Sequence, residues 1–121
     1  MGEVTIYHNR LFGLRACTKS RQTLELLSAR GITPRVVQYL DTPPDAATLK
    51  RLLKLLSMQP RQLMRTHEAP YAELHLADPA RSDDELIAAM THHPILIERP
   101  IVEANGRAVI GRPPENVLQI I

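Results

Sequence analysis

The segment Ala16-Cys17-Thr18-Lys19-Ser20-Arg21-Gln22-Thr23-Leu24 organises the rest of the chain. It contains the only cysteine, and its second half opens an amphipathic run over residues 20–30 that predicts a helix ended by Gly31. Residues 4–7, ahead of it, have the composition of a short strand. A cysteine between a strand and a helix lies near the first free N–H groups of that helix, which favour a thiolate and attract oxyanions. Two predictions therefore stand side by side: a reactive Cys17 thiol with a lowered pKa, or a small buried side chain.

Composition restricts the class of protein. The chain has 121 residues, of which 44% are hydrophobic and 23% charged, as in an ordinary single globular domain. One cysteine can form neither an internal disulfide nor a multi-cysteine zinc site, so any redox chemistry needs a second thiol from another molecule. The net charge of +2 is too small to indicate nucleic-acid binding. With no apolar run of about 18 residues and no signal-peptide pattern, we predict a cytoplasmic protein without membrane contact.

The order of predicted elements indicates an α/β fold. A strand over residues 35–40 follows the first helix closely, which predicts a βαβ unit with parallel pairing. Helices are predicted for residues 45–56 (N-cap Asp45), 60–65, 71–76 and 82–92 (N-cap Ser82), and a last one for 115–120. Asn105-Gly106 between two apolar runs predicts a hairpin over residues 101–110. The result is a mixed sheet, with two strands early and two late, flanked by helices on both faces.

Charged residues at element boundaries are candidates for anion binding. Arg65 ends a predicted helical turn, and Arg99 and Arg112 each precede a proline, which keeps the residue before it extended. The guanidinium fork suits oxyanions, although single arginines near turns are more often surface residues. His8, at the end of the first strand, is predicted either to influence the thiol or to cap the strand. The other four histidines lack ligand spacing, so no metal site is predicted.

Several collinear motifs resemble the ArsC-like arsenate reductases. They are Tyr7-His8-Asn9, residues 17–24, 39–44, 63–65, 70–74 and 93–102, and Gly111-Arg112-Pro113-Pro114-Glu115. The resemblance covers nearly the whole chain. Within the family, the chain is similar to the short, glutaredoxin-dependent branch. It implies a single domain over residues 1–121 with a thioredoxin-like four-stranded mixed sheet flanked by helices. It also implies a helical insert, at about residues 45–92, between the second and third strands.

The resemblance also implies roles for particular residues. Cys17 matches the family's nucleophile, and three arginines match its oxyanion ligands: Arg65, Arg99 and Arg112. His8, Ser20 and Arg21 match positions around the cysteine. No bound cofactor is implied. The implied substrate is arsenate, glutathione is the co-substrate, and glutaredoxin is the partner that reduces the resulting mixed disulfide.

One stretch departs from the family pattern. Seven residues, 10–16, separate Asn9 from Cys17, and none is a proline, whereas the family has a shorter gap that begins with proline. A catalytically impaired member of the family is therefore an alternative. A second alternative is a regulator that binds RNA polymerase, but such members typically carry Cys-x-x-Cys, and here Ser20 occupies the second cysteine position. Reduction of another small substrate, such as a glutathione mixed disulfide, is a third.

Overall fold

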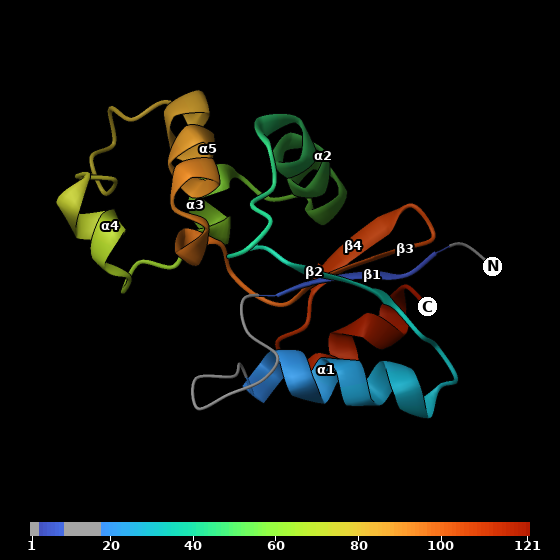
Figure 1. Cartoon of the computed structure of the whole chain (residues 1–121). Coiled ribbons are helices and arrows are strands. Elements are labelled where there is room, and N and C mark those ends of the chain that lie inside the picture. The colour runs from blue at the N-terminus through green and yellow to red at the C-terminus, as the bar shows by residue number, and fades with distance from the viewer. Residues whose placement is uncertain (1–2, 9–17) are drawn as a thin grey trace. The chain divides into compact units, whose positions relative to one another are not determined.

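The chain folds into two compact units. A computed structural model describes residues 3–8 and 18–121. One unit comprises Met1–Thr42 together with Arg99–Ile121, and the other comprises Pro43–Glu98 (Figure 1). The first unit contains the sheet, and the second contains the helices that lie between the second and third strands of the sequence.

The sheet unit has a mixed sheet with the order β2-β1-β3-β4. Its strands are β1 (Thr5–His8), β2 (Arg35–Gln38), β3 (Ile101–Ala104) and β4 (Arg107–Ile110). β1 runs parallel to β2 and antiparallel to β3, and β3 pairs antiparallel with β4. The predicted α/β class, with its parallel βαβ unit and its helical insert after the second strand, is confirmed.

Helix α1 (Thr18–Ala29) makes the crossover from β1 to β2. It begins two residues before the predicted start, and it ends as predicted near Gly31, whose φ of 75° places it in the left-handed region. The N–H of Gly31 donates to the carbonyl oxygen of Ser28, and that of Ile32 donates to that of Leu27. This pattern satisfies the last carbonyl groups of the helix, and glycine adopts it without steric cost.

One face of the sheet packs against α1 and the 3₁₀ helix η2 (Pro114–Gln119), as Figure 1 shows. The side chains that meet there are all buried: Ile6, Leu27, Val102, Ala104, Val117 and Ile120. Full burial of each large aliphatic side chain contributes about 1.5–3 kcal/mol, so this cluster holds both helices on the sheet.

The hairpin between β3 and β4 forms at the predicted Asn-Gly turn. Asn105 and Gly106 have φ values of 54° and 71°, as a two-residue turn of type I′ requires. The Asn105 side-chain amide donates to the carbonyl oxygen of Ile120 at 2.8 Å, which ties the turn to the end of the described chain.

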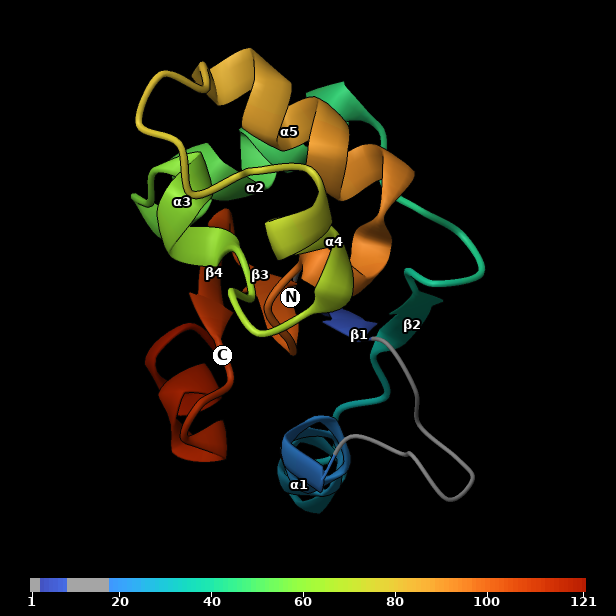
Figure 2. The same cartoon turned by 90° about the vertical axis from the view of Figure 1, so that its left-hand side faces the viewer.

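The helical unit contains α2 (Ala46–Leu56), α3 (Pro60–Leu63), α4 (Ala69–Glu73), α5 (Asp83–His92) and the 3₁₀ helix η1 (Pro94–Leu96). Asp45 caps α2 by accepting a hydrogen bond from the N–H of Thr48 at 2.8 Å. Ser82 and Glu85 form a reciprocal capping box at the start of α5, so both predicted caps are confirmed. α5 packs against α2 and α3 (Figure 2).

Several boundaries differ from those predicted. β1 and β2 are each displaced or shortened by one or two residues, and α3 ends at Leu63. α4 begins at Ala69 because Pro70 suits the first turn of a helix. The last helix is 3₁₀ rather than α, over a six-residue segment. Within the part of the chain that the structure describes, no helix has the length and apolarity needed to cross a membrane.

Replacing Gly111 with alanine is expected to destabilise the protein by about 1–3 kcal/mol, because overpacking forces neighbouring atoms to move. A Cβ at position 111 would lie 2.7 Å from the Thr23 Oγ1 atom and 2.8 Å from the Pro100 Cγ atom. Urea unfolding of Gly111→Ala, Thr23→Ala and the double variant measures this. The double variant should lose less stability than the sum of the single losses; strict additivity would show that the close approach to Thr23 is not the cause.

Candidate active site

The strand directions bring several predicted site residues to one edge of the sheet. His8 ends β1, and the antiparallel β3 begins at that edge because Tyr7 pairs with Ile101. Ile101 in turn pairs with Ile110, so β4 ends there too. Arg99 lies two residues before β3 and Arg112 two residues after β4, and both therefore lie at the carboxyl end of β1. In open α/β sheets, ligands bind at this end of the parallel strands.

The two arginine-proline segments are tied together. Both the Arg99-Pro100 and Arg112-Pro113 peptide bonds are cis. The N–H of Gly111 donates to the Pro100 carbonyl oxygen at 2.9 Å, and the Nε atom of Arg112 donates to the Arg99 carbonyl oxygen at 2.7 Å. Arg99 is half-buried and Arg112 is exposed. The two guanidinium groups thus come from neighbouring, mutually bonded segments.

The first turns of α1 contribute polar side chains near this edge of the sheet. Ser20 is fully buried, and within the described residues its Oγ atom has no hydrogen-bond partner. Thr23 is also fully buried; its hydroxyl donates to the Lys19 carbonyl oxygen at 2.8 Å and lies 3.5 Å from that of Gly111. Arg21 is exposed. Of the two predicted supporting residues on this helix, Ser20 is therefore inside the fold and Arg21 faces solvent.

His8 is a fully buried histidine at the end of β1. Its side chain lies on the same face as Ile6, the face that α1 covers, because side chains alternate along a strand. Among described residues neither ring nitrogen has a hydrogen-bond partner, and burial lowers the pKa of the imidazole. Burial thus favours the neutral form of the His8 imidazole over the charged form.

Arg65 belongs to the helical unit and has acidic partners there. Its Nη1 atom lies 3.0 Å from the Glu68 Oε1 atom, and its Nε atom lies 3.9 Å from the Glu98 Oε1 atom. Its backbone N–H donates to the Leu96 carbonyl oxygen at 2.7 Å. Two of the three predicted arginines, Arg99 and Arg112, are brought together within the sheet unit, while Arg65 is fixed within the other.

Cys17 and the long segment before it, residues 9–16, lie outside the described residues. The role of Cys17 as a nucleophile therefore stays a prediction from the sequence. Among the residues that are described, no three His, Cys, Asp or Glu side chains gather closely enough to hold a metal ion.

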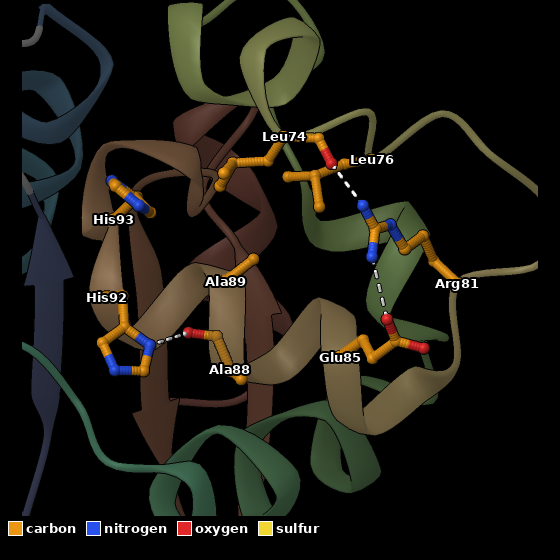
Figure 3. Close-up of a pocket in the computed structure, with 8 residues that line it drawn as sticks. All are labelled: Leu74, Leu76, Arg81, Glu85, Ala88, Ala89, His92 and His93. Carbon is orange, nitrogen blue, oxygen red and sulfur yellow. Dashed lines mark hydrogen bonds and ion pairs between the residues drawn. The ribbon is translucent and has the colours of Figure 1, made fainter.

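A cavity of about 360 Å³ in the helical unit contains none of the predicted site residues. Leu74, Leu76, Ala88 and Ala89 give it an apolar lining, as Figure 3 shows. The Arg81 guanidinium bonds the Leu74 carbonyl oxygen and Glu85, and the His92 Nδ1 atom lies 2.8 Å from the Ala88 carbonyl oxygen. These polar groups are occupied within the protein, so the cavity offers little to a reacting substrate.

The burial of His8 predicts a pH-dependent stability. The folded-state pKa of His8 lies below the ordinary value of about 6.5, so between the two values the unfolded chain binds more protons than the folded one. Stability should fall as the pH is lowered through this window, by at most about 1.4 kcal/mol per pH unit, and be unaffected by His8 above it.

Urea unfolding between pH 7.5 and pH 5 measures this effect. The free energy of unfolding of His8→Gln should depend less steeply on pH than that of the wild type. His67→Gln changes an exposed histidine and should leave this pH dependence unchanged. Equal slopes for the wild type and His8→Gln would contradict a buried, neutral His8.

Comparison with known proteins identifies the family. A model of the ArsC family matches residues 12–120. The chain is 45% identical over 122 residues to an arsenate reductase of Neisseria meningitidis serogroup B, an alignment that covers 100% of both chains. It is 56% identical over 120 residues to the uncharacterized protein YfgD of Escherichia coli (strain K12), covering 98% of this chain and 97% of that protein. The solved arsenate reductase from Vibrio cholerae superposes with a TM-score of 0.91 at 51% identity, covering 99% of this chain and 98% of the other. The chain therefore belongs to the ArsC family.

Proposed function

We propose that this protein is an arsenate reductase that uses Cys17 as its nucleophile and takes the remaining thiols from glutathione and glutaredoxin. The observation that carries the proposal is the 45% identity, over the full length of both chains, to a protein named arsenate reductase. The candidate residues support it, because a cysteine next to a helix start is combined with arginines suited to an oxyanion.

The proposed reaction transfers two electrons from thiols to arsenic. The Cys17 thiolate bonds to arsenic, and one arsenate oxygen leaves as water. The glutathione thiolate then attacks the Cys17 sulfur, and the electron pair of the sulfur–arsenic bond stays on arsenic, which leaves as arsenite. Cys17 and glutathione are now joined in a disulfide. A glutaredoxin thiolate attacks the glutathione sulfur, releasing Cys17 and regenerating the enzyme.

The chain itself supplies only part of this chemistry. Because it contains one cysteine, the second and third sulfur atoms must come from outside. Arg99 and Arg112 at the edge of the sheet would balance the charge of arsenate and favour the Cys17 thiolate, whereas Arg65 is paired with Glu68 and Glu98 in the helical unit. Because burial disfavours the charged form of His8, in this proposal His8 shapes the site around the cysteine and Ser20 supplies a buried hydroxyl.

The sequence before Cys17 supports a second candidate, a family member with impaired activity. The seven residues between Asn9 and Cys17 exceed the family's gap. A longer loop has more conformational entropy to lose when it closes around an anion. Shortening it from seven residues to about two lowers the closure cost by roughly 1 kcal/mol, or about fivefold in affinity.

A coupled assay with arsenate, glutathione, glutaredoxin and NADPH tests the proposed function. We expect NADPH consumption that depends on arsenate, and complete loss of it in Cys17→Ser. A variant with five of residues 10–16 removed, and with proline after Asn9, should be several-fold faster. If the wild type equals Cys17→Ser while the shortened variant is active, the protein is an impaired member. If all three are alike, arsenate is not its substrate.

The arginines should act on one anion, which is tested by protection of Cys17 from alkylation. Sulfate and arsenate should protect the wild type, and Arg99→Ala or Arg112→Ala should weaken this protection about tenfold, because each removes a charge-assisted hydrogen bond. Lysine at either position should restore it only in part, because a point charge lacks the fork of guanidinium.

The matched control is Arg30→Ala, which removes an exposed arginine just after α1. It should leave protection unchanged. Undiminished protection in both the Arg99 and Arg112 alanine variants would show that these residues do not share an anion.

A further inference from the structure

The side chain of Asn116, in the first turn of η2, reaches back to the end of β4 and to the segment that follows it. Its Nδ2 atom donates to the Ile110 carbonyl oxygen at 3.1 Å and to the Arg112 carbonyl oxygen at 3.2 Å. Its backbone N–H donates to the Pro113 carbonyl oxygen at 3.0 Å. This one half-buried residue therefore bonds three carbonyl groups of the segment that carries Arg112.

The two acceptors of the side chain fix the orientation of the Asn116 amide. Both are carbonyl oxygens, which can only accept hydrogen bonds, so the amide nitrogen and not the amide oxygen must face them. An amide nitrogen carries two hydrogens, one for each of the two carbonyl groups. A carboxylate or an apolar side chain of the same size cannot replace this group, because neither has a donor.

The segment that Asn116 holds is bonded in turn to the chain around Arg99. Gly111 donates its N–H to the Pro100 carbonyl oxygen at 2.9 Å, and the Arg112 Nε atom donates to the Arg99 carbonyl oxygen at 2.7 Å. The N–H groups of a guanidinium lie in one plane, so a bond at Nε restricts the plane in which the terminal nitrogen atoms donate. The direction of this guanidinium thus depends on the backbone that Asn116 holds.

We propose that Asn116 is a positioning residue for the candidate oxyanion site, because its amide sets the direction from which Arg112 meets the anion. The role toward the anion rests on the proposed function. Asn116 acts through the backbone of residues 110–113 and does not itself bind the anion. A guanidinium bonds two oxygen atoms of an anion only when its plane is aligned with them. Arg112 is exposed, and an exposed arginine that is not held in advance loses more conformational entropy on binding.

Anion binding is tested by titrating the full chain with sulfate, followed by calorimetry at neutral pH. Asn116→Leu keeps the size of the side chain but has no donor, and it should weaken the affinity for sulfate about fivefold. Asn116→Gln keeps an amide on a longer stem and should restore part of this loss. Arg112→Ala should weaken binding further, because it removes the charge itself. Equal affinities of the wild type and Asn116→Leu, in a protein whose Arg112→Ala variant binds more weakly, would overturn the proposal.

The matched control is Asn105→Gly. The Asn105 side-chain amide also donates to a backbone carbonyl oxygen of the sheet unit, that of Ile120, but at the turn end of the β3–β4 hairpin. Glycine suits the positive φ of 54° at this position, so the substitution removes the bond without strain. The affinity for sulfate should be unchanged, with every variant measured where urea unfolding shows it to be fully folded. A loss equal to that of Asn116→Leu would show general loosening of the unit and overturn the specific role.

A measurement without any anion separates this proposal from the proposed function. NMR follows the Nε–H group of Arg112, whose exchange with water is slowed by its bond to the Arg99 carbonyl oxygen. The exchange should be about fivefold faster in Asn116→Leu and unchanged in Asn105→Gly. Equal rates in the wild type and Asn116→Leu would overturn the proposal. If the rate changes but the wild type binds no sulfate, the proposed anion site fails, while the coupling of Asn116 to Arg112 stands.

Discussion

The sheet unit depends on the double pairing of β1. Thr5–His8 is paired on one side with a parallel strand and on the other with an antiparallel strand, and all four of its residues are buried. Parallel pairing needs a crossover, which α1 supplies, so the N-terminus of that helix must lie at the carboxyl end of β1. Antiparallel pairing brings the start of β3 to the same end. The strand directions alone therefore bring residues that are far apart in the sequence to this end of β1.

The close approach of Thr23 and Pro100 to Gly111 then restricts the backbone at this edge of the sheet. The position has no room for a Cβ because Thr23 of α1 and Pro100 occupy that space. A hydrogen bond from Gly111 to Pro100 and one from Arg112 to the Arg99 carbonyl oxygen join the two arginine-proline segments. The same contact positions both the arginines and the opening residues of η2. The geometry of the candidate anion site therefore depends on this packing constraint.

Features set by local chemistry were predictable from the sequence. Asp45, Ser82 with Glu85, and Asn105-Gly106 each specify a cap or a turn through bonds within a few residues, and each forms as predicted. The prediction of an α-helix at the end of the chain was wrong, because the segment forms a 3₁₀ helix. In a six-residue segment, the choice between α and 3₁₀ depends on packing rather than on periodicity. The order of predicted elements already indicated a helical block at about residues 45–92 between the early and late strands, and the family resemblance agreed with it.

Side-chain environments were harder to predict than elements. The sequence left open whether His8 influences the thiol or caps the strand. The burial of the His8 side chain depends on α1, which packs over that face of the sheet, and the sequence of β1 does not show this. Whether residues 1–121 act as a single domain stays a prediction.

Charge balance distinguishes the three arginines of the proposed site. Arg65 already lies beside two carboxylates, at 3.0 Å from Glu68 and 3.9 Å from Glu98, so its field is largely compensated within the helical unit. An anion that used Arg65 would have to share it with those acids, and the gain would be small. Arg99 and Arg112 lie on segments bonded to each other at the edge of the sheet, in the same unit as the start of α1. Burial lowers the pKa of His8, so the proposed oxyanion site would draw its positive charge from these two guanidinium groups and the start of α1 rather than from the imidazole.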